Sequence, residues 1–241
     1  MAGEDIRELR VKVSTFEGTW TTDKGMSFFL INMIVVIFVV FPLAGIGAFA
    51  RLVADVAFTA MIVSGALAVR RNRVLTGLLI LLAISILLFH WRAHFAQSFH
   101  PMVYASLVLA QFGCIVVVML VEVFRPGQVT FHRVQGAVAA YLSIGLTWAY
   151  AYYLASLISP GAVQFNTQMT ANEIPVERYV YFSFMTLTTV GYGDAVPVHP
   201  LTRTLAISEA LLGQLYPAIL IATVLGLALA ARTQGKPADK H

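Results

Sequence analysis

Long apolar runs constrain the fold of this chain more than any other feature. A helix of about 20 apolar residues crosses a bilayer, and six candidate spans can be placed, at residues 27–48, 53–69, 74–95, 101–121, 131–156 and 201–231. The 241 residues are 59% hydrophobic and only 12% charged. A soluble domain with that composition could not cover its surface. We therefore predict an integral membrane protein.

The positions of Lys and Arg predict how the spans are oriented, because cytoplasmic loops carry an excess of both. With both termini in the cytoplasm, 12 of the 16 Lys and Arg residues lie on the inner side. The outer side then holds Arg51, Arg92, Arg178 and Arg203. The first two spans are so close in sequence that we expect a tight hairpin around Arg51.

The segments outside the spans carry little further information. Residues 1–26 lack the apolar core and cleavage site of a signal peptide, so we expect a cytoplasmic N-terminal segment. Residues 233–241 are expected to be a short cytoplasmic tail. The single cysteine, Cys114, lies in an apolar run and is expected to pack as a small hydrophobe. The small size of the chain points to a prokaryotic inner membrane.

A polar stretch at residues 157–200 interrupts the apolar pattern on the predicted outer side and contains the string TLTTVGYGD, residues 186–194. Gly191 and Gly193 alternate with Val190 and Tyr192, and glycine tolerates the positive φ angles that an extended run of inward-facing carbonyls requires. Thr189 adds a hydroxyl to its carbonyl at the inner end. Four such strands around an axis form stacked rings of oxygens, which can replace the water shell of a cation.

In this context TVGYG resembles the selectivity filter of the tetrameric potassium-channel family. The resemblance covers residues 131–232 and implies an outer helix, a pore helix at Val176–Thr188, the filter and an inner helix. It implies an all-α membrane protein with six transmembrane helices per subunit and a re-entrant pore helix and filter loop. Residues 27–124 then form a four-helix domain, and residues 125–232 form the pore domain.

The resemblance also implies a function. Four identical chains would conduct potassium passively, with K+ held at the carbonyls of Thr189, Val190, Gly191 and Tyr192, and with Gly193 completing the filter. No cofactor is expected apart from the permeant ion, and the expected partners are membrane lipid and three further copies of the chain, not nucleic acid.

Several residues around the string are expected to support the filter. Tyr181 and Phe182 stand where the family has an aromatic pair, and we expect a packed cuff with Tyr192. Thr188 precedes the filter and Asp194 follows it. Some family members place a glutamate behind the filter, paired with this aspartate, where this chain has Met185. We therefore expect different inactivation.

Polar residues in or near the spans are costly if they face lipid, so each is expected to face protein, water or an interface, with Asp55 and Glu122 near span ends. They are Asn32, Asp55, Gln111, Glu122 and Glu209. Glu209 lies far enough into the last span to support the pore helix or filter by hydrogen bonding.

Two residues in the last span weaken the same helical turn. Pro217 removes one backbone hydrogen bond and clashes with the carbonyl of Gly213, four residues earlier. In the resembling family the inner helix bends near such a glycine, so we propose Gly213 and Pro217 as a gating hinge. The alternative is a static kink that only shapes the cavity.

The fourth span, PMVYASLVLAQFGCIVVVMLV, contains no Lys or Arg. Charges that move through the membrane field couple voltage to opening, so we expect weak voltage dependence. The cluster Arg70, Arg71 and Arg73 is interpreted as a topology anchor of the inner loop.

Three histidines, His90, His94 and His100, lie at the outer end of the third span. His90 and His94 are four residues apart and share a helix face, a spacing that suits a metal ion or a pH sensor. No carboxylate or cysteine is adjacent in the sequence, and an aromatic and histidine belt at the membrane interface is the simpler interpretation.

Two other functions remain open: a potassium transporter subunit, and a non-conducting membrane sensor built on a channel fold. Transporters of this kind usually carry four degenerate filters, whereas this chain has one complete string. An enzyme is not expected, because no nucleophile and base set stands out. The sequence leaves the gating stimulus open among pH, lipid, tension and a partner.

Overall fold

The computed structural model describes residues 23–44, 47–68, 73–95, 100–125, 130–166 and 175–234. Most of the predicted N-terminal segment, the tail beyond Gln234, and Arg70 and Arg71 lie outside these residues. The elements are α2 (Asp23–Val35), η1 (Val36–Val40), α3 (Phe41–Ala44), α4 (Ala48–Ala68), α5 (Arg73–Phe95), α6 (Pro101–Val123), α7 (Phe131–Ile158), β1 (Val163–Phe165), α8 (Pro175–Leu187), β2 (Ala195–Pro197) and α9 (Pro200–Gln234).

Within these described ranges, five helical stretches are long and apolar enough to cross a membrane: Gly25–Ala44, Phe49–Ala68, Val74–Trp91, Pro101–Val123 and Pro200–Thr223. The first is α2, η1 and α3 in succession. Its π-helical turn precedes Pro42, and the N–H of Phe41 reaches back to the carbonyl of Val36. These helices indicate a membrane protein.

The predicted fifth span is present as α7, a continuous helix of 28 residues, but it is not among the five apolar stretches. Five tyrosines and tryptophans lower its hydropathy: Tyr141, Trp148, Tyr150, Tyr152 and Tyr153. Several of these side chains donate hydrogen bonds to α8 and α9. The residues that tie α7 to its neighbours therefore also lower its mean hydropathy. Six spans therefore remain a prediction.

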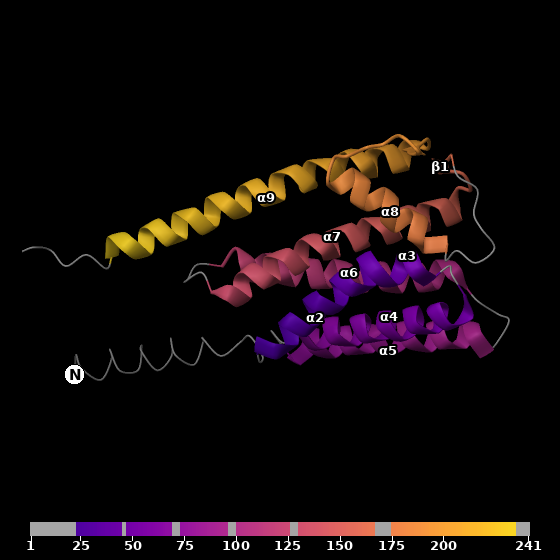
Figure 1. Ribbon diagram of the computed structural model, residues 1–241, viewed down its shortest axis with the longest axis horizontal. Coiled ribbons are helices and arrows are strands. Elements are labelled where there is room, and N and C mark those ends of the chain that lie inside the picture. The colour runs from indigo at the N-terminus through magenta and orange to yellow at the C-terminus, as the bar shows by residue number, and fades with distance from the viewer. Residues whose placement is uncertain are drawn as a thin grey trace, which may run out of the picture.

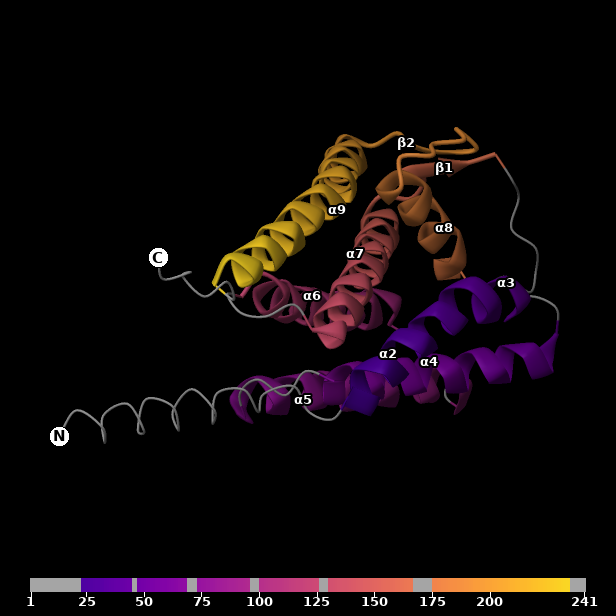
Figure 2. The same ribbon diagram turned by 60° about the vertical axis from the view of Figure 1, so that its left-hand side comes forward.

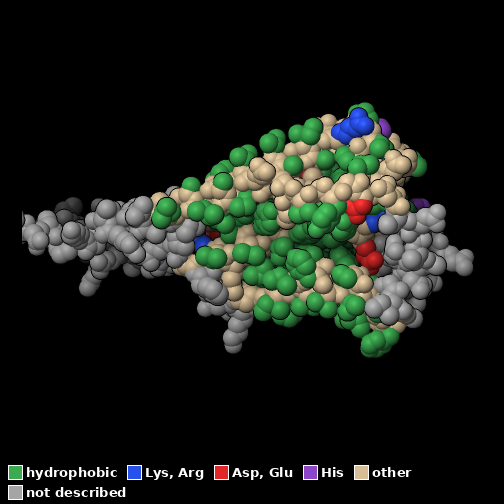
Figure 3. Space-filling model, turned by 45° about the horizontal axis from the view of Figure 1, so that its top comes forward, with side chains coloured by type: hydrophobic (Ala, Val, Ile, Leu, Met, Phe, Trp, Pro, Cys, Tyr) green, Lys and Arg blue, Asp and Glu red, His purple; other side chains and the backbone are tan. Residues whose placement is uncertain are grey.

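The helices that precede α7 are here called the front helices. One of them, α6, lies with α7 between α9 and the pair α4 and α5 (Figures 1 and 2). α6 packs extensively against α7, and α2 also contacts α7. The front helices therefore contact the C-terminal part of the same chain through α2 and α6. α8 is short and contacts both α7 and α9. On the face in Figure 3, hydrophobic side chains cover the middle, and the few charged side chains gather toward the two ends.

Two sequence expectations need correction. α4 begins at Ala48, and the N–H of Arg51 bonds to the carbonyl of Gly47 at 3.0 Å. Arg51 therefore lies in the first turn of a helix and not in the hairpin, because the helix extends five residues further toward the N-terminus than its apolar run. The chain is also not purely α-helical, since β1 and β2 form a two-stranded antiparallel ribbon.

Candidate functional site

The backbone that follows α8 alternates in conformation. Thr189, Gly191 and Gly193 have φ angles of +58°, +54° and +82°, and Thr189 is the one non-glycine residue with positive φ in the described ranges. Val190 and Tyr192, between them, do not have positive φ. Left-handed geometry costs a residue with a Cβ about 1–2 kcal/mol, so Thr189 is held there by its surroundings.

The amide groups and the carbonyl groups of this segment have different partners. The N–H groups of Val190 and Gly191 both donate to the carbonyl of Met185, at 2.9 and 3.3 Å, which folds the segment back on the end of α8. In the described part of the chain, the carbonyls of Thr189 through Gly193 accept no backbone hydrogen bond, and all five residues are exposed. The segment thus offers a row of unpaired carbonyl oxygens.

The residues just before the segment are anchored on α8. The hydroxyl of Thr188 donates to the carbonyl of Phe184 at 2.6 Å, and that of Thr186 donates to the carbonyl of Phe182 at 2.9 Å. α8 ends at Leu187, so its carbonyl end, which carries partial negative charge, adjoins the row of oxygens.

Asp194 anchors the chain as it leaves the segment. The hydroxyl of Tyr181 donates to Asp194 Oδ2 at 2.8 Å, and the N–H of Asn166 donates to the Asp194 carbonyl at 2.9 Å. β2 then pairs with β1, and the Thr202 hydroxyl bonds to the Ala162 carbonyl at 2.8 Å. The hydrogen bond to the carboxylate raises the pKa of Tyr181 above its usual value.

The aromatic residues expected to form a cuff differ in exposure. Phe182 is 4% exposed and packs on Tyr152 of α7, with ring centroids 4.7 Å apart. Tyr192 is 74% exposed. Within one chain Phe182 and Tyr192 therefore form no packed cuff, because Phe182 is turned into the core.

Glu209 lies at the meeting point of α7, α8 and α9, where it is completely buried. Its Oε1 is 2.5 Å from the Ser183 hydroxyl, and its Oε2 accepts a 2.7 Å hydrogen bond from the Tyr152 hydroxyl. Ser183 also lies 2.6 Å from the Gly145 carbonyl. The sequence indicates a supporting role for Glu209 but not its partners, since hydroxyls in neighbouring helices leave no pattern along the chain.

Gly213 lies where α9 crosses the end of α8. A Cβ atom placed on Gly213 would be 1.9 Å from the carbonyl oxygen of Leu187, so no side chain fits there. The same carbonyl accepts the Tyr141 hydroxyl at 3.4 Å. Pro217 lies inside α9, which is helical on both sides of it. Gly213 therefore allows α9 to pack closely against the end of α8, a role that its spacing from Pro217 does not reveal.

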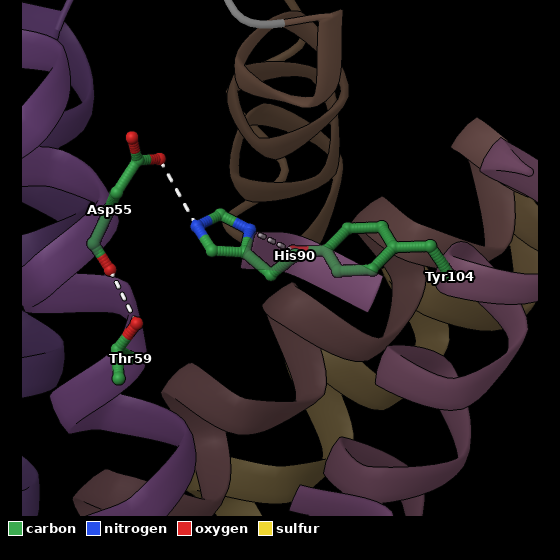
Figure 4. Close-up of polar contacts among 4 residues, drawn as sticks. All are labelled: Asp55, Thr59, His90 and Tyr104. Carbon is green, nitrogen blue, oxygen red and sulfur yellow. Dashed lines mark hydrogen bonds and ion pairs between the residues drawn. The ribbon is translucent and has the colours of Figure 1, made fainter. Parts of the chain in front are cut away.

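His90 pairs with a carboxylate that the sequence did not place beside it. Its Nε2 lies 3.2 Å from Asp55 Oδ1 in α4, and its Nδ1 lies 3.3 Å from the Tyr104 hydroxyl in α6 (Figure 4). Figure 4 also shows the Thr59 hydroxyl donating to the Asp55 carbonyl at 2.7 Å. His100 precedes α6 and is exposed, while the side chain of His94 lies outside the described atoms. His90 is therefore part of a polar contact between three front helices, and the described residues contain no group of three or more metal ligands.

Comparisons with known proteins point the same way as the geometry. Residues 137–229 match a protein family described as "Ion channel". Protein LctB of Geobacillus stearothermophilus is 50% identical over 46 residues, and Protein LctB of Bacillus caldotenax is 46% identical over 46 residues. Each alignment covers 19% of this chain and 34% of the relative, so the match spans about a third of those proteins. No solved structure matches the chain. The family match supports an ion channel.

Proposed function

We propose that this protein is a potassium-selective channel in which four copies surround one pore and K+ passes passively through it. The observation that carries the proposal is the TVGYG backbone. Its φ angles are positive at every second residue, its amides turn back on Met185, and its carbonyls are unpaired and exposed. Backbone carbonyls without fixed charge suit rapid potassium passage, because they replace the hydration shell without trapping the ion.

The exposure of the filter side chains supports assembly. Val190 is 47% exposed and Tyr192 is 74% exposed, although apolar and aromatic side chains behind a filter should be packed. Neighbouring subunits would cover them in a tetramer. One strand cannot encircle an ion, and closed rotational symmetry is the usual solution for identical chains. We place the channel in the cell membrane with both termini in the cytoplasm.

A flux assay tests the proposal directly. Purified protein in liposomes is expected to pass potassium down a gradient, with block by barium. Gly191→Ala forces a Cβ into left-handed geometry, at a cost of about 1–2 kcal/mol, and should reduce flux by roughly tenfold or more. Gly226→Ala is the matched control, since nothing lies within 4 Å of the added Cβ and its φ is not positive.

Two outcomes would favour the other candidate functions. Slow, saturable uptake without single-channel events would favour a transporter subunit. Folded, tetrameric protein that passes no potassium under any tested pH, lipid or tension would favour a sensor.

A further inference from the structure

Four buried polar groups from three helices form one continuous chain of contacts behind the proposed filter. In order they are the Gly145 carbonyl of α7, the Ser183 hydroxyl of α8, the Glu209 carboxyl of α9 and the Tyr152 hydroxyl of α7. Ser183 and Glu209 are 0% exposed, as is Tyr152. No water can therefore supply a missing donor or acceptor to Ser183 or Glu209 from bulk solvent.

The three contacts require three protons. Oxygen atoms 2.5 to 2.7 Å apart need a hydrogen between them, because two lone pairs at that distance repel. The Gly145 carbonyl can only accept. Ser183 and Tyr152 have one hydroxyl proton each, which leaves one contact without a hydrogen if Glu209 is ionised.

One arrangement satisfies every contact. Tyr152 donates to Oε2 of Glu209, Ser183 donates to the Gly145 carbonyl, and Oε1 of Glu209 carries the third proton and donates it to Ser183. We propose that Glu209 is a neutral, protonated acid that positions the pore helix by donating a hydrogen bond to Ser183. The expected effect of Glu209 on potassium flux rests on the proposed channel function, whereas its protonation state does not depend on conduction.

The electrostatic surroundings agree with a neutral group. Among the described residues, the titratable side chains that interact with Glu209 are Tyr152 and Tyr141 of α7, and neither supplies a positive charge. The described part of the chain places no Lys, Arg or His in an ion pair with it. A buried carboxylate without a cation is far more costly than a buried acid with its hydrogen bonds made.

Infrared difference spectroscopy tests the protonation state. The spectrum of wild type minus Glu209→Gln at neutral pH should contain the C=O stretch of a protonated carboxyl, and this band should disappear as the pH is raised. A difference spectrum with only carboxylate bands would overturn the proposal. Because the measurement needs no ion flow, its failure is distinguishable from failure of the channel function.

Potassium flux tests the positioning role. The amide of Glu209→Gln can donate to Ser183 and accept from Tyr152, so flux should stay within about twofold of wild type at pH 7. Glu209→Leu leaves the Tyr152 hydroxyl without its acceptor and removes the donor to the Ser183 oxygen, so it should lower flux by about tenfold. Between pH 7 and alkaline pH, wild type should lose flux while Glu209→Gln does not. A Glu209→Gln variant that fails to assemble, or loses as much flux as Glu209→Leu, would contradict the proposal.

Discussion

Individual residues hold the proposed filter in place through a few hydrogen bonds at its two ends. At the inner end, the Met185 carbonyl accepts hydrogen bonds from the N–H groups of Val190 and Gly191. At the outer end, the Tyr181 hydroxyl donates a hydrogen bond to the Asp194 carboxylate. Met185 therefore acts through its backbone, while its side chain stands where some potassium channels carry a glutamate. Asp194 depends instead on Tyr181, which makes this one hydroxyl important for the outer end.

Tyr181→Phe should destabilise the outer end of the filter. The variant removes the donor that bonds to Asp194 and leaves the ring, so we expect potassium current that decays faster during sustained opening. Tyr179→Phe is the control, because the Tyr179 hydroxyl makes no hydrogen bond in the described structure while its ring packs on Phe165. Equal decay rates in recordings from the two variants would contradict a role for the hydroxyl.

Gly213→Ala should weaken the contact between α8 and α9. The new Cβ would strike the Leu187 carbonyl, and overpacking of this kind costs about 1–3 kcal/mol. Thermal unfolding in detergent should therefore occur at a lower temperature than in Gly226→Ala, which makes the same change on the same helix in open space. Matching melting temperatures in the two variants would show that α9 does not pack against the Leu187 carbonyl at Gly213.

Helices and their contacts determine how the proposed pore could open. Pro217 offers no N–H to the Gly213 carbonyl, so one turn of α9 lacks a backbone hydrogen bond. α7 holds this region through the Tyr216 hydroxyl, which donates to the Ala137 carbonyl at 2.8 Å. Bending at Pro217 would thus move the part of α9 beyond the anchored turn.

Pro217→Ala tests the hinge without the clash that confounds any change at Gly213. Restoring one hydrogen bond, worth about 1 kcal/mol, should shift the balance between closed and open states by about fivefold. We expect lower open probability in single-channel recordings, since a stiffer α9 bends less. An unchanged open probability would indicate a static kink.

The Asp55 and His90 contact should stabilise the packing of α4 on α5. In a double-mutant cycle with Asp55→Asn and His90→Gln, we expect a coupling energy of about 0.5–3 kcal/mol in unfolding free energy. His100→Gln is the control, because His100 is exposed. A coupling energy of zero would mean that the pair contributes nothing to the fold.

Helix positions were largely predictable from the sequence, but contacts between helices were not. The lengths of the apolar runs predicted where the long helices lie to within a few residues. Each end of α8, at Pro175–Leu187, lies within one residue of the predicted pore helix. The bond between Ser183 and Glu209 joins residues 26 apart, and that between Tyr152 and Glu209 joins residues 57 apart. Such pairings depend on how the helices pack, and periodicity along one helix carries no information about them.

The whole molecule presents apolar surface that one chain cannot cover. Along α9, Ile207, Leu211 and Leu215 are 64%, 58% and 52% exposed. These residues are four apart and form a stripe on one helix face. Lipid or neighbouring subunits must cover this stripe, and its position on the same helix that supports the filter fits an assembly around a central pore.

The ratio of potassium to sodium permeability decides whether the proposed pore selects potassium. Purified protein in planar bilayers, with potassium and sodium on both sides in opposite gradients, should give single-channel currents whose reversal potential lies close to the potassium equilibrium potential. This selectivity is expected because uncharged carbonyl rings replace the potassium hydration shell. A reversal potential that shows equal permeability to sodium and potassium would contradict it.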